Sequence, residues 1–334
     1  MRTSARPDAT LILTRSDVLA LLTLPECIDA VEDAFRRHAA GRTLPPGVLG
    51  LPATGGGFHI KAAGLLGEPG YFAAKTNTNF PANARAGLPT IQGTVLLADV
   101  STGVVLAVMD SASITALRTG AATAVAAKYL ARPEARTATI VGCGVQGEIQ
   151  LAALAAVRRL EQAWVIDLDP ERAAGLAKRA TGALGLRVEP VTDLAAALRR
   201  SDVCVTCTTS RHPFLRQADV RPGTFVAAVG ADNRDKQELE PALLASATLV
   251  VDVLEQCAEL GELQHALAAG LMTRERVHAE LADVVTGHRP GRTRADEITV
   301  FDSSGTALQD VAAAAVVYQK ARAAGRGLPV RFDG

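Results

Sequence analysis

The chain has 334 residues, of which 35 are Lys or Arg and 35 are Asp or Glu, so its formal net charge at pH 7 is zero. This balance excludes the basic surface that nucleic acid or an anionic membrane would require. Hydrophobic residues make up 48% of the chain, yet no unbroken apolar run approaches the ~18 residues of a membrane span. Length and composition therefore predict a soluble globular protein of about two domains.

The cysteine pattern and the N-terminus both favour the cytoplasm. The five cysteines are an odd number and are scattered along the chain, as in proteins of a reducing compartment. The N-terminal segment lacks the apolar core of a secretory signal. Cys204 and Cys207 do form a CxxC pair, but they lie in a predicted buried strand, where residues three apart point to opposite faces. Because the six histidines also lack metal-ligand spacing, we expect no metal site.

The first third of the chain predicts helix followed by antiparallel sheet. Ser16 and Asp17 open a helical apolar pattern that continues over 25–41, with Pro25 in a first turn and Gly41 at a C-terminus. The apolar period then becomes two, which predicts strands over 57–64, 71–80, 90–99 and 104–110. The turn signal at 99–103 joins the last two strands into a hairpin.

A long helix over 113–131 precedes a stretch in which strands and helices alternate. Strands are expected over 137–144, 163–169, 186–191, 202–209, 224–231, 248–253 and 297–302. The intervening helices imply right-handed βαβ units and a parallel sheet. We therefore predict an α/β protein with a Rossmann-type dinucleotide-binding domain over 119–306. A smaller α+β domain for substrate binding and dimerisation would comprise 1–118 and 307–334, because the last helix, 306–325, can return to it.

The strongest motif is TATIVGCGVQGEIQ, which has glycines in GxGxxG spacing directly after an apolar strand and at the start of a helix. Gly142 would allow the tight turn, Gly144 the approach of the backbone to a pyrophosphate, and Gly147 the close crossing of helix over strand. The helix N-terminus, with Val145 and Gln146, would supply amide donors and a partial positive charge. This context predicts a dinucleotide site.

Asp167 ends the next predicted strand, 25 residues after Gly142. Its carboxylate can accept hydrogen bonds from the adenosine ribose and would repel a 2′-phosphate, so the sequence favours NAD over NADP. The alternative is that the glycines only turn a corner and that Asp167 starts a turn. We also assign Thr208 and Val229, near the ends of two further predicted strands, to the cofactor set.

Two cations in apolar surroundings are candidates for an anion site in the first domain. Lys75 lies inside a predicted strand without an acidic neighbour, and Arg118 lies in a helix otherwise built of small residues. Each is either a solvated surface charge or part of a pocket that clamps an anion. The residue pattern alone does not decide between these two interpretations.

Five segments of the chain, taken in order, resemble the ornithine cyclodeaminase and mu-crystallin family. They are KTNTNFPANARAGLPTIQGTVLLADVSTGVVLAVMD, ITALRTGAATAVAAKYLAR, IVGCGVQG, VGADNRDKQEL and EITVFDSSGTALQDVA. The resemblance covers essentially the whole chain. The family includes cyclodeaminases, alanine dehydrogenases and reductases of cyclic or linear imino acids.

The resemblance implies a homodimer whose substrate domains join sheets across the two-fold axis, and a nicotinamide cofactor in the second domain. Lys75 matches the family lysine that contacts the substrate carboxylate or the reacting centre, and Arg118 matches an arginine that binds carboxylate beside the pyrophosphate. Asp232 matches the acidic residue by the substrate amine. Thr90 and Ser303 match residues near the nicotinamide.

The chain departs from the family pattern at two places. The family often has PPR before its first strands, where this chain has Gly47 after two prolines, so one carboxylate-binding arginine is missing. The strand before Lys75 also lacks the glutamate that ornithine cyclodeaminases tend to have. Lys61 in that strand can replace the lost arginine, and His59 lies on the same strand face, so both are candidate substrate contacts. For His59 the alternative is an ordinary structural histidine.

These residues predict an NAD(H)-dependent oxidoreductase that transfers hydride between nicotinamide and the α carbon of a small amino or imino acid. The chemistry needs a cationic clamp for the carboxylate and an acid or base near nitrogen, which Lys75, Arg118 and Asp232 can supply. One alternative is an ornithine-type cyclodeaminase, an ammonia lyase that recycles NAD, although the missing glutamate weakens it. The other is a mu-crystallin-like binding protein, in which Asp232 would have no proton to carry.

Overall fold

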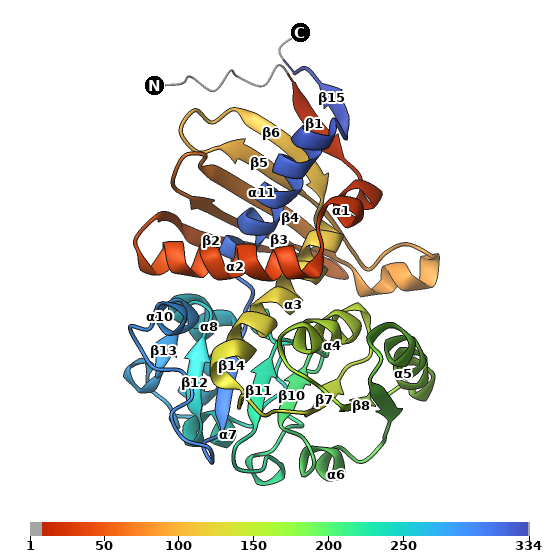
Figure 1. Ribbon diagram of the computed structural model, residues 1–334, viewed down its shortest axis with the longest axis vertical. Coiled ribbons are helices and arrows are strands. Elements are labelled where there is room, and N and C mark those ends of the chain that lie inside the picture. Colours follow the sequence, from red (N-terminus) through yellow and green to blue (C-terminus); the bar gives the residue numbers. More distant parts are fainter. Residues whose placement is uncertain (1–8, 333–334) are drawn as a thin grey trace. The chain divides into compact units, whose positions relative to one another are not determined.

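The computed structural model describes residues 9–332 and divides the chain into two compact units (Figure 1). The first, here called unit 1, holds the chain up to Arg118 and from Ala307 onward. The second, unit 2, holds Thr119–Thr306. Among the described residues no helix is long and apolar enough to cross a membrane.

Unit 1 is built on a seven-stranded sheet with the strand order β15-β1-β6-β5-β4-β3-β2. Its strands are β1 (Thr10–Leu13), β2 (Thr43–Ala53), β3 (Gly56–Leu65), β4 (Tyr71–Asn79), β5 (Ile91–Asp99), β6 (Val105–Asp110) and β15 (Leu328–Val330). Neighbouring strands are antiparallel except for the parallel pair β1 and β6. The hairpin between β5 and β6 lies where its turn signal predicts it.

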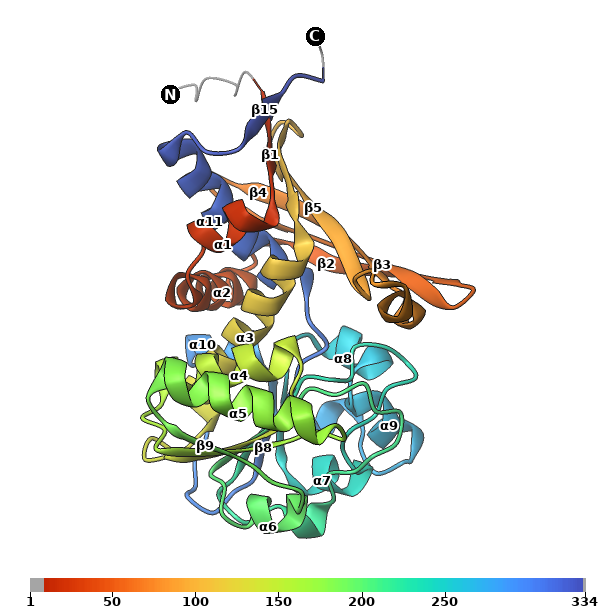
Figure 2. The ribbon, with the colours of Figure 1, turned by 90° about the vertical axis from the view of Figure 1, so that its right-hand side faces the viewer.

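Helices cover one face of this sheet. They are α1 (Arg15–Leu21), α2 (Leu24–Ala39) and α11 (Ala307–Ala324), and a short 3-10 helix, η1 (Pro81–Ala86), connects β4 to β5. Figure 2 shows α1, α2 and α11 together on the same side of the strands. Helix α11 packs on β3 and β4 and against α2. The last helix therefore covers the strands that hold Lys61 and Lys75.

Unit 2 has an eight-stranded parallel sheet with the order β13-β12-β14-β11-β10-β7-β8-β9. The strands are β7 (Thr137–Val141), β8 (Gln162–Ile166), β9 (Arg187–Pro190), β10 (Val203–Thr206), β11 (Phe225–Ala228), β12 (Thr248–Val251), β13 (Ala279–Glu280) and β14 (Thr299–Asp302). Counted from β7 and read from β9, five of these strands have the order 3-2-1-4-5 of the doubly wound dinucleotide fold, and β14 takes the place of the sixth strand. The predicted fold class is confirmed.

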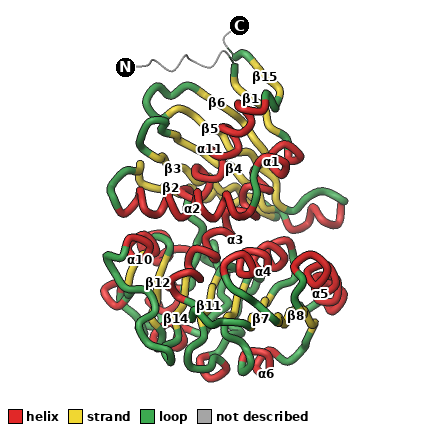
Figure 3. The backbone as a smooth tube through the Cα atoms, viewed as in Figure 1, coloured by secondary structure: helices red, strands yellow, loops and turns green. Residues whose placement is uncertain are grey.

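The connections of unit 2 are mostly helical (Figure 3). They are α4 (Val145–Val157), α5 (Pro170–Leu184), α6 (Leu194–Leu198), α7 (Pro241–Ser246), α8 (Leu254–Leu260), α9 (Leu263–Ala268), α10 (Leu281–Thr286), η2 (Gln217–Asp219) and η3 (Arg274–Arg276). Helix α3 (Ser111–Leu130) starts in unit 1 and continues into unit 2. The parallel strands are almost fully buried, as expected of a sheet that helices cover on both faces.

The structure adds four strands that the sequence patterns did not predict, β1, β2, β13 and β15. The segment LPPGVLGLPA contains three prolines and two glycines, which normally argue against a strand. It nevertheless forms β2 at the edge of the sheet, with a register shift between Leu44 and Gly47 where two of the prolines lie. An edge strand pairs on one side only, so proline is tolerated there. Strand β1 is only four residues long, too short to show a period.

The start of the first helix also differs from the prediction. Thr14, not Ser16, is the N-cap residue of α1: its hydroxyl accepts from the amide of Asp17, whose carboxylate accepts from the amide of Thr14. This reciprocal pair is a capping box, and Thr23 and Glu26 form the same box at the start of α2. The sequence signal for both boxes is a threonine three residues before an acidic residue. For α1, the apolar pattern that begins at Ser16 obscured this signal.

Phe35 of α2 is fully buried, whereas Phe332 is 72% exposed. We expect Phe35→Ala to lower the free energy of unfolding by about 3 to 5 kcal/mol, because it removes apolar contacts and leaves a cavity. Phe332→Ala is the matched control and should change it by less than about 0.5 kcal/mol. Urea denaturation followed by circular dichroism measures both; equal stabilities of the two variants would contradict this packing.

Candidate active site

The loop between β7 and α4 has the geometry of a dinucleotide-binding turn. Gly142 has φ +103°, a left-handed conformation that side chains disfavour, and its amide donates to the carbonyl of Ile166. A Cβ atom at Gly147 would lie 2.1 Å from the carbonyl oxygen of Gly142, so the first turn of α4 crosses the loop too closely for a side chain. A Cβ atom at Gly144 would meet no atom within 4 Å. The space beside Gly144 leaves the backbone open to a ligand.

Asp167 is held directly beside this loop. One carboxylate oxygen accepts from the amide of Cys143 (2.7 Å) and the other from the amide of Asp169 (3.0 Å). Asp169 in turn is the N-cap residue of α5, where its carboxylate accepts from the amide of Glu171. The two acidic residues therefore have separate tasks, and Asp167 is the one that lies at the glycine turn.

Buried carboxylates hold the loops that follow several strands of unit 2. Glu238 accepts from the amides of Thr208 (2.6 Å) and Gly230 (2.9 Å), which follow β10 and β11. The amide of Glu238 donates to Glu262 (2.7 Å), and the amide of Glu262 donates to Asp302 (3.0 Å) at the end of β14. Because ligands of open parallel sheets bind at the carboxyl ends of the strands, this network supports the expected cofactor edge.

Burial shifts the pKa values of these acids upward. It raises the pKa of Glu238 and, more strongly, that of Glu262, where the neighbouring Asp302 adds to the effect. For Asp302, burial raises the pKa to about 7 despite the backbone amides that stabilise its charge. These upward shifts favour the neutral forms of the acids, which limits repulsion among carboxylates that backbone amides hold in place.

The remaining predicted residues of unit 2 lie near this edge. Val229, directly after β11, and Ser303, directly after β14, are buried. Asp232 lies four residues after β11 and is about half exposed, and the ammonium of Lys236 donates to its carboxylate at 2.7 Å. His265 of α9 contacts the carbonyl of Lys236 (2.8 Å) and so helps to fix this loop. The predicted proton carrier thus lies in an ion pair that the sequence analysis missed.

Unit 1 contains a buried cluster of charges. The ammonium of Lys75 on β4 donates to Asp310 of α11 at 2.8 Å. The Nε atom of Arg118 on α3 lies 3.1 Å from the same carboxylate oxygen, and its Nη1 atom donates to Gln309 at 2.8 Å. All four side chains are buried. Lys75 and Arg118, far apart in sequence, therefore meet at one carboxylate.

Lys61 and His59 lie on β3, next to this cluster. Lys61 is directly opposite Lys75 in the β3–β4 register, on the sheet face that α11 covers, and it is buried. His59, two residues earlier on the same face, is partly exposed. Thr90 precedes β5, where its carbonyl accepts from the amide of Phe80. Of the predicted residues in unit 1, the structure brings Lys61, Lys75 and Arg118 together and leaves Thr90 on a separate loop.

The charge cluster shifts the pKa values of its members in opposite directions. Burial, and then the Arg118 guanidinium and Lys61, lower the pKa of Lys75 to about 7, while Asp310 opposes this change. Burial acts to raise the pKa of Asp310, but Lys75, Arg118 and Lys61 outweigh it and hold that pKa below its usual value. At neutral pH, Asp310 is charged and Lys75 is close to its titration point.

Asp310 and Gln309 are site residues that the sequence analysis missed. They lie in ALQDVAAAA, where an acid and an amide begin an otherwise apolar helix. The simplest interpretation of such residues is that they are polar groups at the N-terminus of a helix. The available signal was that α11 is apolar on all sides around Asp310, which predicts a buried helix and hence a paired carboxylate.

Comparison with known proteins places the chain in a family. The model of the ornithine cyclodeaminase/mu-crystallin family matches residues 8–325. The chain belongs to this family. Solved relatives include Δ(1)-pyrroline-2-carboxylate reductase of Thermococcus litoralis in complex with NADH and L-proline, at 35% identity and a TM-score of 0.92 over 96% of this chain and 100% of that one.

Two further relatives are similar over nearly their full lengths. An archaeal alanine dehydrogenase dimer with bound NAD is 38% identical, with a TM-score of 0.92 over 97% of this chain and 99% of that one. The iminosuccinate reductase of Paracoccus denitrificans in complex with NAD+ is 34% identical, with a TM-score of 0.89 over 97% and 100%. The resemblance that the sequence motifs predict is therefore confirmed, and it extends to family members that act as oxidoreductases.

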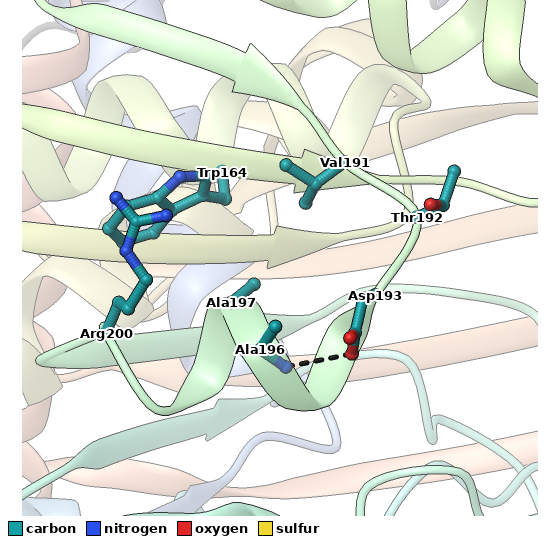
Figure 4. Close-up of a pocket in the computed structure, with 7 residues that line it drawn as sticks. All are labelled: Trp164, Val191, Thr192, Asp193, Ala196, Ala197 and Arg200. Carbon is teal, nitrogen blue, oxygen red and sulfur yellow. Dashed lines mark hydrogen bonds between the residues drawn. The ribbon is translucent and has the colours of Figure 1, made fainter.

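A pocket of about 270 Å³ lies elsewhere in unit 2, on the α6 side of β8 (Figure 4). The guanidinium of Arg200 stacks over the ring of Trp164 with 4.4 Å between the guanidinium carbon and the ring centroid. Asp193 accepts from the amide of Ala196 and caps α6. The remaining lining residues are Val191, Thr192 and Ala197. None is a predicted site residue, and their contacts anchor α6 on the sheet.

The close crossing at Gly147 gives a direct test of the glycine turn. We expect Gly147→Ala to weaken NADH binding at least about tenfold, because the new Cβ atom would force the loop and α4 apart. Gly182→Ala in α5 is the control: a Cβ atom there would meet nothing within 4 Å, and alanine favours helix. Fluorescence titration with NADH measures both variants. Wild-type affinity in Gly147→Ala would contradict the assignment of the loop.

Proposed function

We propose that this family member is an NAD(H)-dependent oxidoreductase that transfers hydride between nicotinamide and the α carbon of a small amino or imino acid. It is an amino acid dehydrogenase or an imine reductase. The observation that carries the proposal is the buried pair of cations, Lys75 and Arg118, in a chain that also has a dinucleotide turn. The alanine dehydrogenase, pyrroline-carboxylate reductase and iminosuccinate reductase relatives support the same class of reaction.

In this proposal Lys75 and Arg118 bind the substrate carboxylate. Both are buried, so their attraction for a carboxylate is weakly screened, and a guanidinium can hold it through two parallel hydrogen bonds. Lys61, opposite Lys75, takes the place of the arginine that the family has where this chain has Gly47. His59 lies at the more exposed end of the same strand face and would contact the remainder of the substrate.

Asp232 is proposed to carry the proton at the substrate nitrogen. When an amino acid is oxidised, hydride leaves Cα for NAD+ and the nitrogen, which becomes part of an imine, must release a proton. In the reductive direction the proton and the hydride return. Lys236, paired with Asp232, favours the ionised carboxylate that can accept this proton. Lys75 is the second residue proposed to contact the reacting centre.

The cofactor would lie along the carboxyl edge of the sheet in unit 2. The proposed contacts are Thr90, Arg118, Gly142, Gly144, Val145, Gln146, Gly147, Asp167, Thr208, Val229 and Ser303. A bound nicotinamide would supply or accept the hydride. Asp167 favours NAD over NADP, because its fixed carboxylate at the glycine turn would repel a 2′-phosphate.

We further propose a homodimer formed through the sheet of unit 1. The strand face away from the helices has apolar side chains on neighbouring strands, among them Leu49, Leu51 and Phe58, which are 40 to 52% exposed. Contiguous exposed apolar side chains commonly mark protein interfaces, and the archaeal alanine dehydrogenase relative is a dimer.

The cytoplasmic location stays a prediction, which the five free cysteines support.

The reaction class is tested by following cofactor and product together. We expect net reduction of NAD+ with at least one of L-alanine, L-proline, L-ornithine or L-lysine, or net oxidation of NADH with Δ1-pyrroline-2-carboxylate or with pyruvate and ammonia. Absorbance at 340 nm reports the cofactor and mass spectrometry the product. A cyclic amino acid and ammonia without net cofactor change would instead identify a cyclodeaminase. NADH binding without any turnover would identify a binding protein.

Asp232→Asn tests the proton carrier. The amide keeps the shape of the side chain but cannot accept a proton, so we expect kcat to fall about 100-fold or more while the Kd for NADH stays within about twofold. Asp235→Asn is the control, since Asp235 is an exposed carboxylate three residues away on the same loop. Steady-state kinetics and NADH titration of both variants decide the matter. Full activity of Asp232→Asn would reject this role.

A further inference from the structure

Unit 1 places three cations within one buried cluster. Lys61, Lys75 and Arg118 are 7%, 3% and 5% exposed. Lys61 and Lys75 face each other directly across β3 and β4, where like charges repel. Each charge has also lost most of its contact with water, which raises the free energy of the folded protein unless a partner is present. The cluster therefore needs an anion even before a substrate arrives.

Asp310 supplies that anion. It is 1% exposed, and a single carboxylate oxygen faces both the Lys75 ammonium (2.8 Å) and the Arg118 Nε atom (3.1 Å). The preceding residue, Gln309, accepts from the Nη1 atom of Arg118 at 2.8 Å. Two consecutive residues at the start of α11 thus hold cations that belong to a strand and to another helix. Arg118 thus makes one hydrogen bond, from Nη1 to Gln309, and its Nε atom is in ion-pair contact with Asp310 without forming a hydrogen bond.

The other oxygen of Asp310 is buried without a hydrogen-bond partner, as is the Nε2 atom of Gln309. Two cations, Lys75 and Arg118, thus share one carboxylate, so these three groups carry a net positive charge when Lys75 is protonated. A second carboxylate, that of a substrate, would reduce this net charge. This imbalance between two cations and one carboxylate differs from an ordinary internal salt bridge, in which one cation meets one anion. It suits a site that binds a further carboxylate.

We propose that Asp310 is a positioning residue for the substrate carboxylate, acting through Lys75 and Arg118: it holds the two cations beside each other, against their mutual repulsion, in the geometry that receives the carboxylate. This inference rests on the proposed function and extends it, because nothing in the reaction chemistry itself calls for Asp310. Its side chain does not have to touch the substrate.

The titratable and charged groups that face Lys75 come from four elements. They are Lys61 on β3, Arg118 on α3, Asp310 on α11 and Cys27 on α2, which lies near Arg118 and Asp310. Burial raises the pKa of the Cys27 thiol to about 12, so it stays neutral. Lys75, with a pKa of about 7, titrates in the neutral range. Substrate binding should therefore weaken as pH rises through about 7, when Lys75 loses its proton.

Asp310→Asn removes the opposing charge and keeps the shape of the side chain. Asp310 raises the pKa of Lys75. Removing its charge should lower that pKa, so KM should begin to increase at a lower pH than in the wild-type enzyme. At pH 7 we expect KM for the imino or amino acid to increase at least about tenfold, with the Kd for NADH unchanged within about twofold. Asp310→Glu retains the charge, so it should restore the wild-type pH limit even if its longer side chain raises KM.

Two comparisons separate this role from a purely structural one. In a Lys75→Met background, Asp310→Asn should have a much smaller effect on KM, because the group through which it acts is gone. Asp310→Asn with wild-type KM and pH profile would overturn the proposal while leaving the proposed function intact. If the wild-type enzyme turns over none of the substrates, the proposed function fails, and the titration of Lys75 in the wild-type protein still tests the cluster.

That titration needs no change at Asp310. The ¹⁵N signal of the Lys75 side chain, assigned by its loss in Lys75→Met, should titrate near pH 7 in the NADH complex. Binding of a substrate carboxylate should move the titration to higher pH, since a second anion stabilises the charged lysine. A Lys75 titration that does not respond to a substrate carboxylate would overturn the role of Asp310 even if Asp310→Asn fails to fold.

Discussion

The ion pair between Lys75 and Asp310 is the interaction on which unit 1 depends. It joins the central part of the sheet to the last long helix, and Arg118 shares the same carboxylate. Charges of this kind are unfavourable in a protein interior unless they are matched, so the helix and the strands constrain each other's positions. A charge-assisted hydrogen bond is more directional than an apolar contact, so it favours one position of α11 on β3 and β4.

Unit 2 uses buried charge in a different way. Its acids, Glu238, Glu262 and Asp302, accept hydrogen bonds from backbone amides of neighbouring loops, and burial raises their pKa values. Each carboxylate ties one loop to the next along the carboxyl edge of the sheet. The loops that are proposed to contact the cofactor are thereby held in place through their backbone. In unit 1 a buried carboxylate positions cationic side chains, whereas in unit 2 buried carboxylates position the backbone of the loops.

Local patterns predicted much of this arrangement, because their causes are local. The glycine spacing follows from one turn and one helix crossing, and the alternation of strands and helices follows from the parallel sheet, so both were visible in short segments. Lys75 and Arg118 stood out as charges in apolar surroundings. Asp310 did not stand out as a site residue, because its partners lie 235 and 192 positions away in the sequence. No pattern within α11 indicates which residues those partners are. Likewise the pairing of Asp232 with Lys236 depends on a loop conformation, and β2 depends on an edge that tolerates proline.

The late position of α11 in the chain has a consequence for synthesis. Residues 119–306 form a continuous unit that can fold as soon as they emerge, whereas the sheet of unit 1 waits for a helix that begins at Ala307. Because 235 residues separate Lys75 from Asp310, the ribosome needs roughly 10 to 50 seconds to connect them at ordinary elongation rates. During that interval Lys61 and Lys75 must remain hydrated, and the strands around them cannot pack into a closed core. The middle of the nascent protein can therefore fold before its beginning.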